Sequence, residues 1–286
     1  MMQPIRKLSK EELDHGIKEV KEQGYTVFEN VLTPDQANHY RNLCDQIFDD
    51  YSHAYEQGKT DQVFHGDAKV KMVFNLHNKH PDFIPLLFDE NLAYLNNALL
   101  KEGSYNNAEP YQLHISTARG ISGPAEPQQL HIDSNIPGSN YVLMMQMFWA
   151  LTDMNDENGA TRLVPKSHKK MAFAETGKHY DDEVVVNCPK GSLFAVDAGT
   201  WHGSSTKQEG SDDRWVIVNG YSRWWMRPTF DASLNTSKDV YDQLTDEQRD
   251  ILGLKYKMPV DEFERTARIS NEHHYHDEYS LPAAKK

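Results

Sequence analysis

The chain has 286 residues, enough for one large domain or two small ones. Its hydrophobic fraction is 38%, and no apolar run is long enough to cross a bilayer, so we expect no membrane span. A formal net charge of −13 counts against a nucleic acid or an anionic membrane as partner, because both favour a basic surface. An anionic small molecule is compatible with local positive charge at Arg119, Arg162 or Arg223, although each has a solvated surface position as the simpler alternative.

The N-terminal residues 1–7 have neither an apolar core nor a cleavage site, which predicts no signal peptide. Cys44 and Cys188 are the two cysteines of the chain, so the sequence has no disulfide framework and fits a reducing compartment. We therefore expect a cytoplasmic protein, a monomer or homodimer, whose partner is a small-molecule substrate rather than nucleic acid or membrane.

Helix signals dominate the first hundred residues. A capping box at Ser9 and Glu12 begins one helix, Gly24 ends it, and residues 25–28 read as a strand. Proline at position 34 begins a second, amphipathic helix. Residues 51–69 are polar and contain glycine, which indicates a loop or lid, with a plain surface connection as the alternative. Helical patterning returns over residues 83–100.

Strands separated by turns follow. They are predicted at 111–116, at the long apolar run 141–151, at 193–197 and from Arg214 onward, with a loop at 120–127. Beyond residue 228 the chain is helical and charged, with a second capping box at 245–248. The histidines at 273, 274 and 276 could chelate a metal, but a solvated tail is the more common outcome for such a segment.

His131 and Asp133 form the central motif. On an extended segment, residues two apart point to the same side, so this pair can hold one metal ion while Ile132 packs on the other side. His202 follows a short apolar strand and a glycine-containing turn, and we expect it to be exposed as the third ligand. Two imidazoles and one carboxylate make the facial triad of non-haem Fe(II) oxygenases. A His-x-Asp pair alone also arises by chance.

The sequence resembles the phytanoyl-CoA dioxygenase family of Fe(II)- and 2-oxoglutarate-dependent oxygenases. Five features carry the resemblance, and a similar strand-then-helix opening at 24–34 extends it. The five are His131-x-Asp133, the segment 149–153, Asn158-Gly159 leading to 164–168, His202 and Arg214.

Turn-separated strands with helices mainly at the two ends argue for a mainly β core. The resemblance implies a double-stranded β-helix, the jelly-roll or cupin-like fold. We expect a single oxygenase domain over 1–286, with a helical part at about 1–110, a jelly-roll metal core at about 111–228 and a helical extension at about 229–286.

The resemblance also implies roles beyond the metal ligands. Arg214 stands where the family binds the far carboxylate of 2-oxoglutarate, a role suited to the fixed charge and forked donors of a guanidinium. Ser204 and Gln128 match further co-substrate positions, with a turn serine as the alternative for Ser204. The residues expected to line the substrate pocket, each with a core position as its alternative, are Gln146, Phe148, Met144 and His114.

The implied function is an EC 1.14.11-type oxygenase that needs Fe(II), 2-oxoglutarate and O2. It would oxidise, and most simply hydroxylate, an unactivated C–H bond of a small metabolite while 2-oxoglutarate becomes succinate and CO2, with no catalytic side chain beyond the metal ligands. Asp133 argues against halogenation, because halogenating relatives replace that carboxylate. Desaturation or ring closure at the same iron in natural-product biosynthesis is an alternative.

Two other classes stay open. One is a cupin-type metal enzyme, against which Arg214 argues, and the other is a non-catalytic jelly-roll binding protein, against which the intact triad argues. Lys166 and Ile132 depart from residues that are frequent in the family, and they leave the substrate open.

Overall fold

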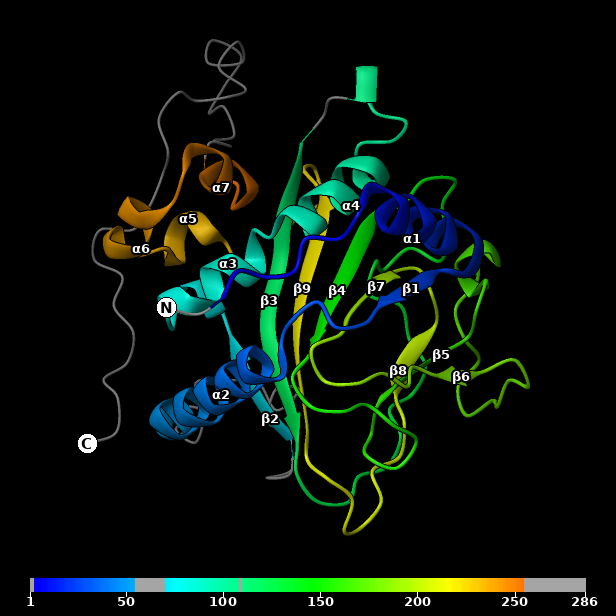
Figure 1. Ribbon diagram of the computed structural model, residues 1–286. Helices are drawn as coiled ribbons and strands as arrows, with labels where there is room; N and C mark the ends of the chain where they lie inside the picture. The colour runs from blue at the N-terminus through cyan, green and yellow to red at the C-terminus, as the bar shows by residue number, and fades with distance from the viewer. Residues whose placement is uncertain (1–2, 55–69, 108–109, 255–286) are drawn as a thin grey trace.

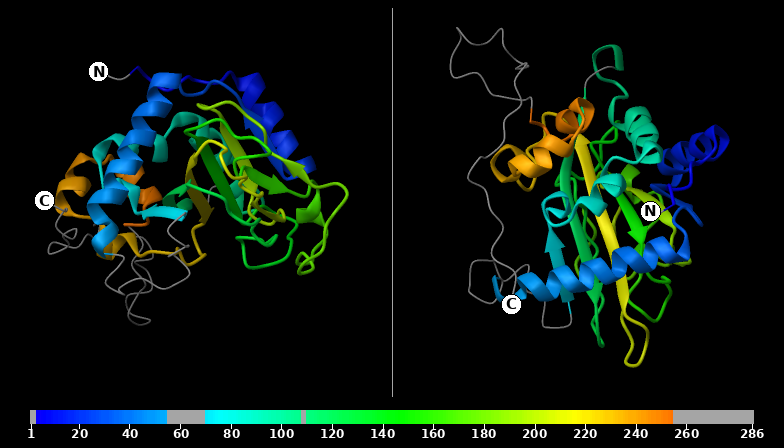
Figure 2. Two further views of the ribbon diagram at one scale, coloured as in Figure 1. Left: turned by 90° about the horizontal axis from the view of Figure 1, so that it is seen from below. Right: turned by 60° about the vertical axis from the view of Figure 1, so that its left-hand side comes forward.

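The protein, seen in a computed structural model, is described over residues 3–54, 70–107 and 110–254. Two β-sheets form its centre, and helices α1 to α4 lie over one side of the larger sheet (Figure 1; Figure 2). Within the described ranges, no helix has the length and apolar character needed to cross a membrane. The helices and strands are α1 (Lys10–Gln23), β1 (Tyr25–Phe28), α2 (Pro34–Ala54), β2 (Val70–Phe74), η2 (Leu76–Asn78), η3 (Pro81–Phe83), α3 (Ile84–Leu87), α4 (Glu90–Leu100), η4 (Tyr105–Asn107), β3 (Tyr111–Ile121), β4 (Met144–Ala150), β5 (Thr161–Leu163), η5 (Ser167–Lys169), β6 (Val184–Val185), β7 (Leu193–Asp197), β8 (His202–Ser204), β9 (Arg214–Arg223), α5 (Ala232–Asn235), α6 (Lys238–Gln243) and α7 (Asp246–Ile251).

The large sheet has the strand order β1-β7-β4-β9-β3-β2, and the small sheet has the order β6-β5-β8. Every strand pair in both sheets is antiparallel. A large and a small antiparallel sheet that enclose a pocket are the arrangement of a jelly roll. The predicted fold class is therefore confirmed.

The central strand β4 is buried along its whole length. Met145, Met147 and Trp149 pack in the cluster that contains the helices, whereas Phe148 and Ala150 pack in the cluster that contains the small sheet. A strand covered on both faces has no need of polar residues at alternate positions, which explains why every residue of β4 except Gln146 is apolar.

Three side chains of the large sheet hold the helical layer by hydrogen bonds to the end of α3. Trp149 Nε1 donates to the carbonyl of Leu86 over 3.2 Å, Asn219 Nδ2 donates to the same carbonyl over 3.1 Å, and the Tyr221 hydroxyl donates to the carbonyl of Leu87. The last carbonyls of a helix have no partner within it. These buried donors satisfy them and fix α3 on the sheet.

The predicted helix signals are confirmed. Both capping boxes form, at Ser9 and at Thr245, and Gly24 ends α1 with a left-handed φ of 93°. The predicted strand at 25–28 is β1, and Arg214 begins β9 as predicted. The expected loop or lid at 51–69 lies mostly outside the described residues, as do the histidines at 273–276.

Two expectations about the sheet need correction. The strand expected at 111–116 continues as β3 to Ile121, so Arg119 and Gly120 lie in a strand and not at the edge of a loop. The large sheet also takes β1 and β2 from the part of the chain before residue 110, and pairing with β2 explains the greater length of β3.

We predict that Trp149→Phe lowers the free energy of unfolding by about 1–3 kcal/mol, because the buried carbonyl of Leu86 loses one of its two donors and the smaller ring leaves a void. Chemical denaturation followed by circular dichroism measures the change. Trp225→Phe is the matched control, since Trp225 is 55% exposed and should change stability little. Equal effects of the two substitutions would contradict the structural role of Trp149.

Candidate metal centre

The side chains of His131, Asp133 and His202 converge on one point. Their candidate ligand atoms all lie within 4.8 Å of one another. Oδ1 of Asp133 is 3.5 Å from Nε2 of His131, and Oδ2 is 3.3 Å from Nε2 of His202. Two imidazoles and one carboxylate so close together can hold one metal ion, and three protein ligands leave further coordination positions for other ligands.

A backbone bridge brings the two histidines together. His131 and His202 form an isolated antiparallel bridge, with N–H to carbonyl distances of 2.9 and 3.0 Å. The expected extended run through His131 and Asp133 is thus shortened to one bridge residue followed by a bend. The expectation of an exposed His202 is also wrong, because this bridge residue is only 5% exposed.

Hydrogen bonds on the far side of each imidazole fix its orientation. Nδ1 of His131 lies 3.0 Å from the carbonyl oxygen of Gln129, and Nδ1 of His202 lies 2.8 Å from that of Thr200. A carbonyl only accepts, so each Nδ1 carries a proton and each Nε2 is the nitrogen that faces Asp133. Nε2 is therefore the atom that each histidine can offer to a metal, which takes the place of any proton there.

Asp133 is held in its ionised form. Burial raises its pKa, but the neighbouring His202 and His131 outweigh burial, so the pKa lies well below the usual range. Nε2 of Gln146 donates to Oδ2 of Asp133 over 2.7 Å, and the backbone N–H of Asp133 donates to the carbonyl of Ala198 over 2.8 Å. The carboxylate has a fixed direction as well as a charge.

One short turn, residues 197–200, connects Asp133 with His202. Its Ala198 carbonyl accepts from Asp133, and its Thr200 carbonyl accepts from the imidazole of His202. The turn is closed by the bond from Thr200 N to the carbonyl of Asp197, 2.8 Å, and by Gly199 N donating to the Asp197 carboxylate, also 2.8 Å. The turn thereby sets the positions of two candidate ligands.

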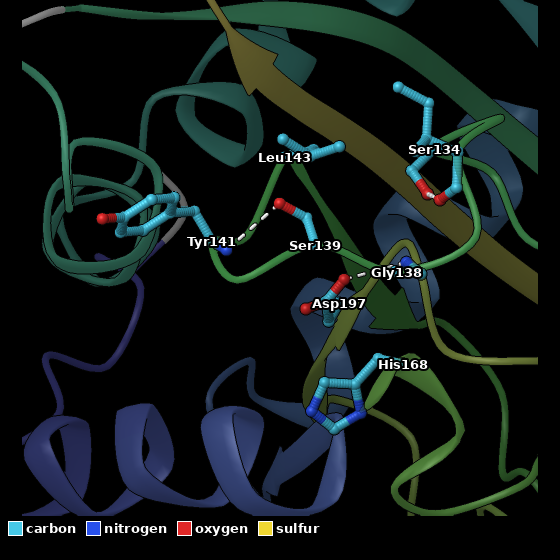
Figure 3. Close-up of a pocket in the computed structure, with 9 residues that line it drawn as sticks. Ser134, Gly138, Ser139, Tyr141, Leu143, His168 and Asp197 are labelled. Atoms are coloured by element: carbon cyan, nitrogen blue, oxygen red, sulfur yellow. Dashed lines mark hydrogen bonds between the residues drawn. The ribbon is translucent and has the colours of Figure 1, made fainter. Parts of the chain in front are cut away.

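The carboxylate of Asp197 borders a small polar pocket of about 10 Å³, the space of a single water molecule. Figure 3 shows Asp197 between the loop of Ser139 and the imidazole of His168. Burial raises the pKa of Asp197 to about 6, although the bond from Gly199 opposes this shift.

The candidate ligands open into a cavity of about 490 Å³ between the two sheets. Arg214 lies in its lining at the start of β9, on the same face as Val216 and Val218. Its Nε and Nη2 donate to the carbonyl of Gly159 over 3.1 and 2.9 Å. Burial and the nearby Arg119 lower the pKa of Arg214 to about 10, so it is still charged at neutral pH.

The other expected site residues divide into two groups. Ser204, Gln128 and Phe148 line the cavity. Gln146 acts on Asp133 and is absent from the lining, as are two further residues for which a pocket position was expected. These two are Met144, which packs close to Gly220, and His114, whose Nδ1 is 3.1 Å from the Ser222 hydroxyl.

One wall of the cavity was not predicted from the sequence, where only its Arg119 was named as a possible contact for an anion. This wall consists of Val70 and Met72 on β2 with Arg119 and Ile121 on β3. Val70 pairs with Ile121 and Met72 pairs with Arg119, so the four side chains share a face. The alternation of Arg119 and Ile121 along one strand was the available signal, but the glycine at 120 suggested a loop.

Two imidazoles and a carboxylate inside a jelly roll, beside a buried arginine, are the arrangement typical of 2-oxoglutarate-dependent oxygenases. Residues 20–213 match the sequence model described as phytanoyl-CoA dioxygenase (PhyH), which is more than half of the chain. The chain belongs to this family of Fe(II)- and 2-oxoglutarate-dependent oxygenases. The matched range stops one residue before Arg214, so the geometry, and not the match, connects Arg214 with the site.

Curated relatives share shorter segments. The chain is 28% identical over 116 residues to "Dioxygenase af480" of Aspergillus fumigatus, which is 40% of this chain and 38% of that protein. It is 29% identical over 169 residues to "Dioxygenase sphC" of the same species, which is 55% of this chain and 45% of the relative. The chain thus matches less than half the length of these relatives.

Solved structures show the same fold at low identity. HygX from Streptomyces hygroscopicus with nickel and 2-oxoglutarate bound has a TM-score of 0.57 and 15% identity, covering 82% of this chain and 92% of HygX. The epimerase SnoN, in complex with Fe3+, alpha ketoglutarate and nogalamycin RO, has a TM-score of 0.56 and 16% identity, covering 77% and 88%.

The raised pKa of Asp197 predicts a pH-dependent stability. Because the folded state binds this proton more tightly than the unfolded state, the stabilisation is complete below pH 3.8 and is lost as the pH rises through about 6. The loss amounts to about 3 kcal/mol at most. Asp197→Asn keeps an acceptor for Gly199 but has no such titration. As the pH rises from 4 to 7.5, the free energy of unfolding of the wild type should therefore fall relative to that of Asp197→Asn. A difference between the two proteins that does not change with pH would contradict the prediction.

Proposed function

We propose that the protein uses Fe(II), 2-oxoglutarate and O2 to hydroxylate an unactivated C–H bond of a small molecule. The observation that carries the proposal is the convergence of His131, Asp133 and His202 in the cavity that also contains Arg214. Family membership and the dioxygenase names of the relatives support the class of reaction.

The residues present fit an Fe(II) ion. Both histidines have Nδ1 bound to a carbonyl and turn Nε2 toward Asp133, which is ionised, so two nitrogens and one oxygen are available as ligands and further coordination positions remain for other ligands. The carboxylate is fixed by Gln146, so its coordinating oxygen needs little reorganisation when a metal enters. Bound Fe(II) would supply the oxidation of the C–H bond, coupled to conversion of 2-oxoglutarate to succinate and CO2.

The residues also fit 2-oxoglutarate. Arg214 is buried and charged, and among the described residues it has no acidic partner, so its free Nη1 can donate to the far carboxylate. Ser204, two residues after His202, lies on the cavity wall, and its hydroxyl can donate a hydrogen bond to the same carboxylate. Gln128, on the rim, is a further contact. The chain thereby orients the co-substrate, while the apolar walls exclude water from the reacting centre.

Hydroxylation is the simplest outcome for this site, and the retained Asp133 favours it over halogenation. Desaturation or ring closure remains the alternative outcome of the same site. The similarity to SnoN, whose title names an alpha ketoglutarate dependent epimerase, shows that this fold also serves other reactions. We propose one oxygenase domain for the chain, which acts in the cytoplasm on a small molecule as a monomer or homodimer.

Metal-free protein, mixed anaerobically with Fe(II) and 2-oxoglutarate, should show the visible metal-to-ligand charge-transfer band of chelated 2-oxoglutarate. His202→Ala should abolish the band, and Arg214→Met should raise the Kd for 2-oxoglutarate about tenfold or more, because a charge-assisted contact is lost. Titration of the band measures both effects.

His15→Ala is the control, since His15 is an exposed histidine on α1, away from the cavity. A band of full strength in His202→Ala would contradict the proposed ligand set. An unchanged Kd in Arg214→Met would instead favour a metal enzyme that does not use 2-oxoglutarate.

A further inference from the structure

The cavity contains a second guanidinium besides that of Arg214. Arg119 lies on β3, directly opposite Met72 of β2 on one side and Val216 of β9 on the other, and all three line the cavity. Ile121, two residues along β3, pairs with Arg214. Arg119 and Arg214 are therefore diagonal neighbours on one face of the sheet, and both line the same cavity.

Arg119 has no partner within the described part of the chain. It makes no hydrogen bond or ion pair there, and its Nε is buried without an acceptor. The remaining acidic residue of the lining, Glu126, is exposed at the rim and forms no ion pair with it. Arg162 and Arg223, the other arginines considered from the sequence, bind Glu183 and the carbonyls of Val142 and Glu102. Arg119 is the member of this group whose charge is left for a ligand.

The charge balance of the site with Fe(II) and 2-oxoglutarate bound also favours an anionic ligand for Arg119. Fe(II) and Arg214 would bring three positive charges, and Asp133 with the two carboxylates of 2-oxoglutarate would bring three negative ones. These balance, and Arg119 then stands as an uncompensated, partly buried cation in the wall of the cavity. Such a cation is costly unless an anion joins it.

We propose that Arg119 binds an anionic group of the substrate, so that the substrate is a small carboxylate or phosphate with an apolar body. The apolar body follows from the rest of the lining, to which Val70, Met72, Ile121, Phe148, Val216 and Val218 contribute apolar side chains. A guanidinium at one end and apolar walls along the side would hold such a molecule in one orientation. This inference rests on the proposed function.

The test compares anions with neutral molecules of the same shape. Full-length protein loaded with Fe(II) and 2-oxoglutarate under nitrogen is titrated calorimetrically with benzoate, phenylacetate, hexanoate and phenyl phosphate, and with the amides of the three carboxylates. We expect at least one carboxylate to bind about tenfold or more tightly than its amide, from a charge-assisted contact. Absence of any preference for the anion in the wild-type protein would overturn the proposal.

Two variants assign the preference to Arg119. Arg119→Met should abolish it, and Arg119→Lys, which keeps the charge without the fork, should retain part of it. Arg249→Met is the matched control, because Arg249 lies on α7 and contacts Tyr241 and Asp246 outside the cavity. Preference for the anion that persists in folded Arg119→Met would also overturn the proposal.

The same proteins show whether the anionic group that Arg119 binds belongs to the substrate or to 2-oxoglutarate. Titration of the charge-transfer band should give a Kd for 2-oxoglutarate in Arg119→Met within about threefold of wild type. A rise as large as that in Arg214→Met would assign Arg119 to the co-substrate and contradict a substrate site. Lack of the band in the wild-type protein is a failure of the proposed function, whereas a normal band without preference for anions is a failure of the Arg119 site alone.

Discussion

The turn at residues 197–200 is the constraint on which the site depends. Its backbone carbonyls hold the N–H of Asp133 and the imidazole of His202, two groups that lie about seventy residues apart in the sequence. The turn itself is fixed because it directly follows β7, which is buried between β1 and β4. Two hydrogen bonds therefore fix Asp133 and His202 relative to the large sheet. The bridge between His131 and His202 fixes the third candidate ligand relative to the same sheet.

This frame has an electrostatic cost. The enclosed space holds a carboxylate at Asp133 and guanidinium groups at Arg119 and Arg214, and among the described residues neither arginine forms an ion pair. Folding that leaves charges without partners is unfavourable, since each loses hydration. The arrangement becomes favourable when ligands of opposite charge enter, so the stability lost to these charges is regained as binding energy. A protein of net charge −13 thus presents an interior that attracts anions.

Local signals in the sequence predicted the capped helices and the longer strands, but not the short strands β2, β5, β6 and β8. The spacing of His131 and Asp133 and the glycine turn before His202 are short-range patterns, whereas Arg214 was expected from the family resemblance, and the structure brings these residues together. Pairing between distant strands was not predictable in the same way. Arg119 was named only as a local cation with a solvated surface position as the alternative, because the strand was expected to end at residue 116. The length of β3 depends on β2, which comes from a different part of the chain. The role of Gln146 was missed for a similar reason: the alternation along β4 gives its face but not the carboxylate that it contacts.

Burial was also beyond the reach of local patterns. His202 was expected to be exposed, but the bridge to His131 and the packing of Trp201 beside it enclose the residue. The consequence is chemical as well as structural, because an enclosed imidazole with Nδ1 committed to a carbonyl presents only Nε2 to the cavity.

The most direct test of the proposed centre is X-ray absorption spectroscopy of the protein loaded with one equivalent of Fe(II). The geometry of His131, Asp133 and His202 predicts two imidazoles in the coordination shell, falling to one in His202→Ala. Three or more imidazoles, or a shell unchanged by that substitution, would place the metal at another site, such as the histidine-rich segment 273–276, and would contradict the proposed centre.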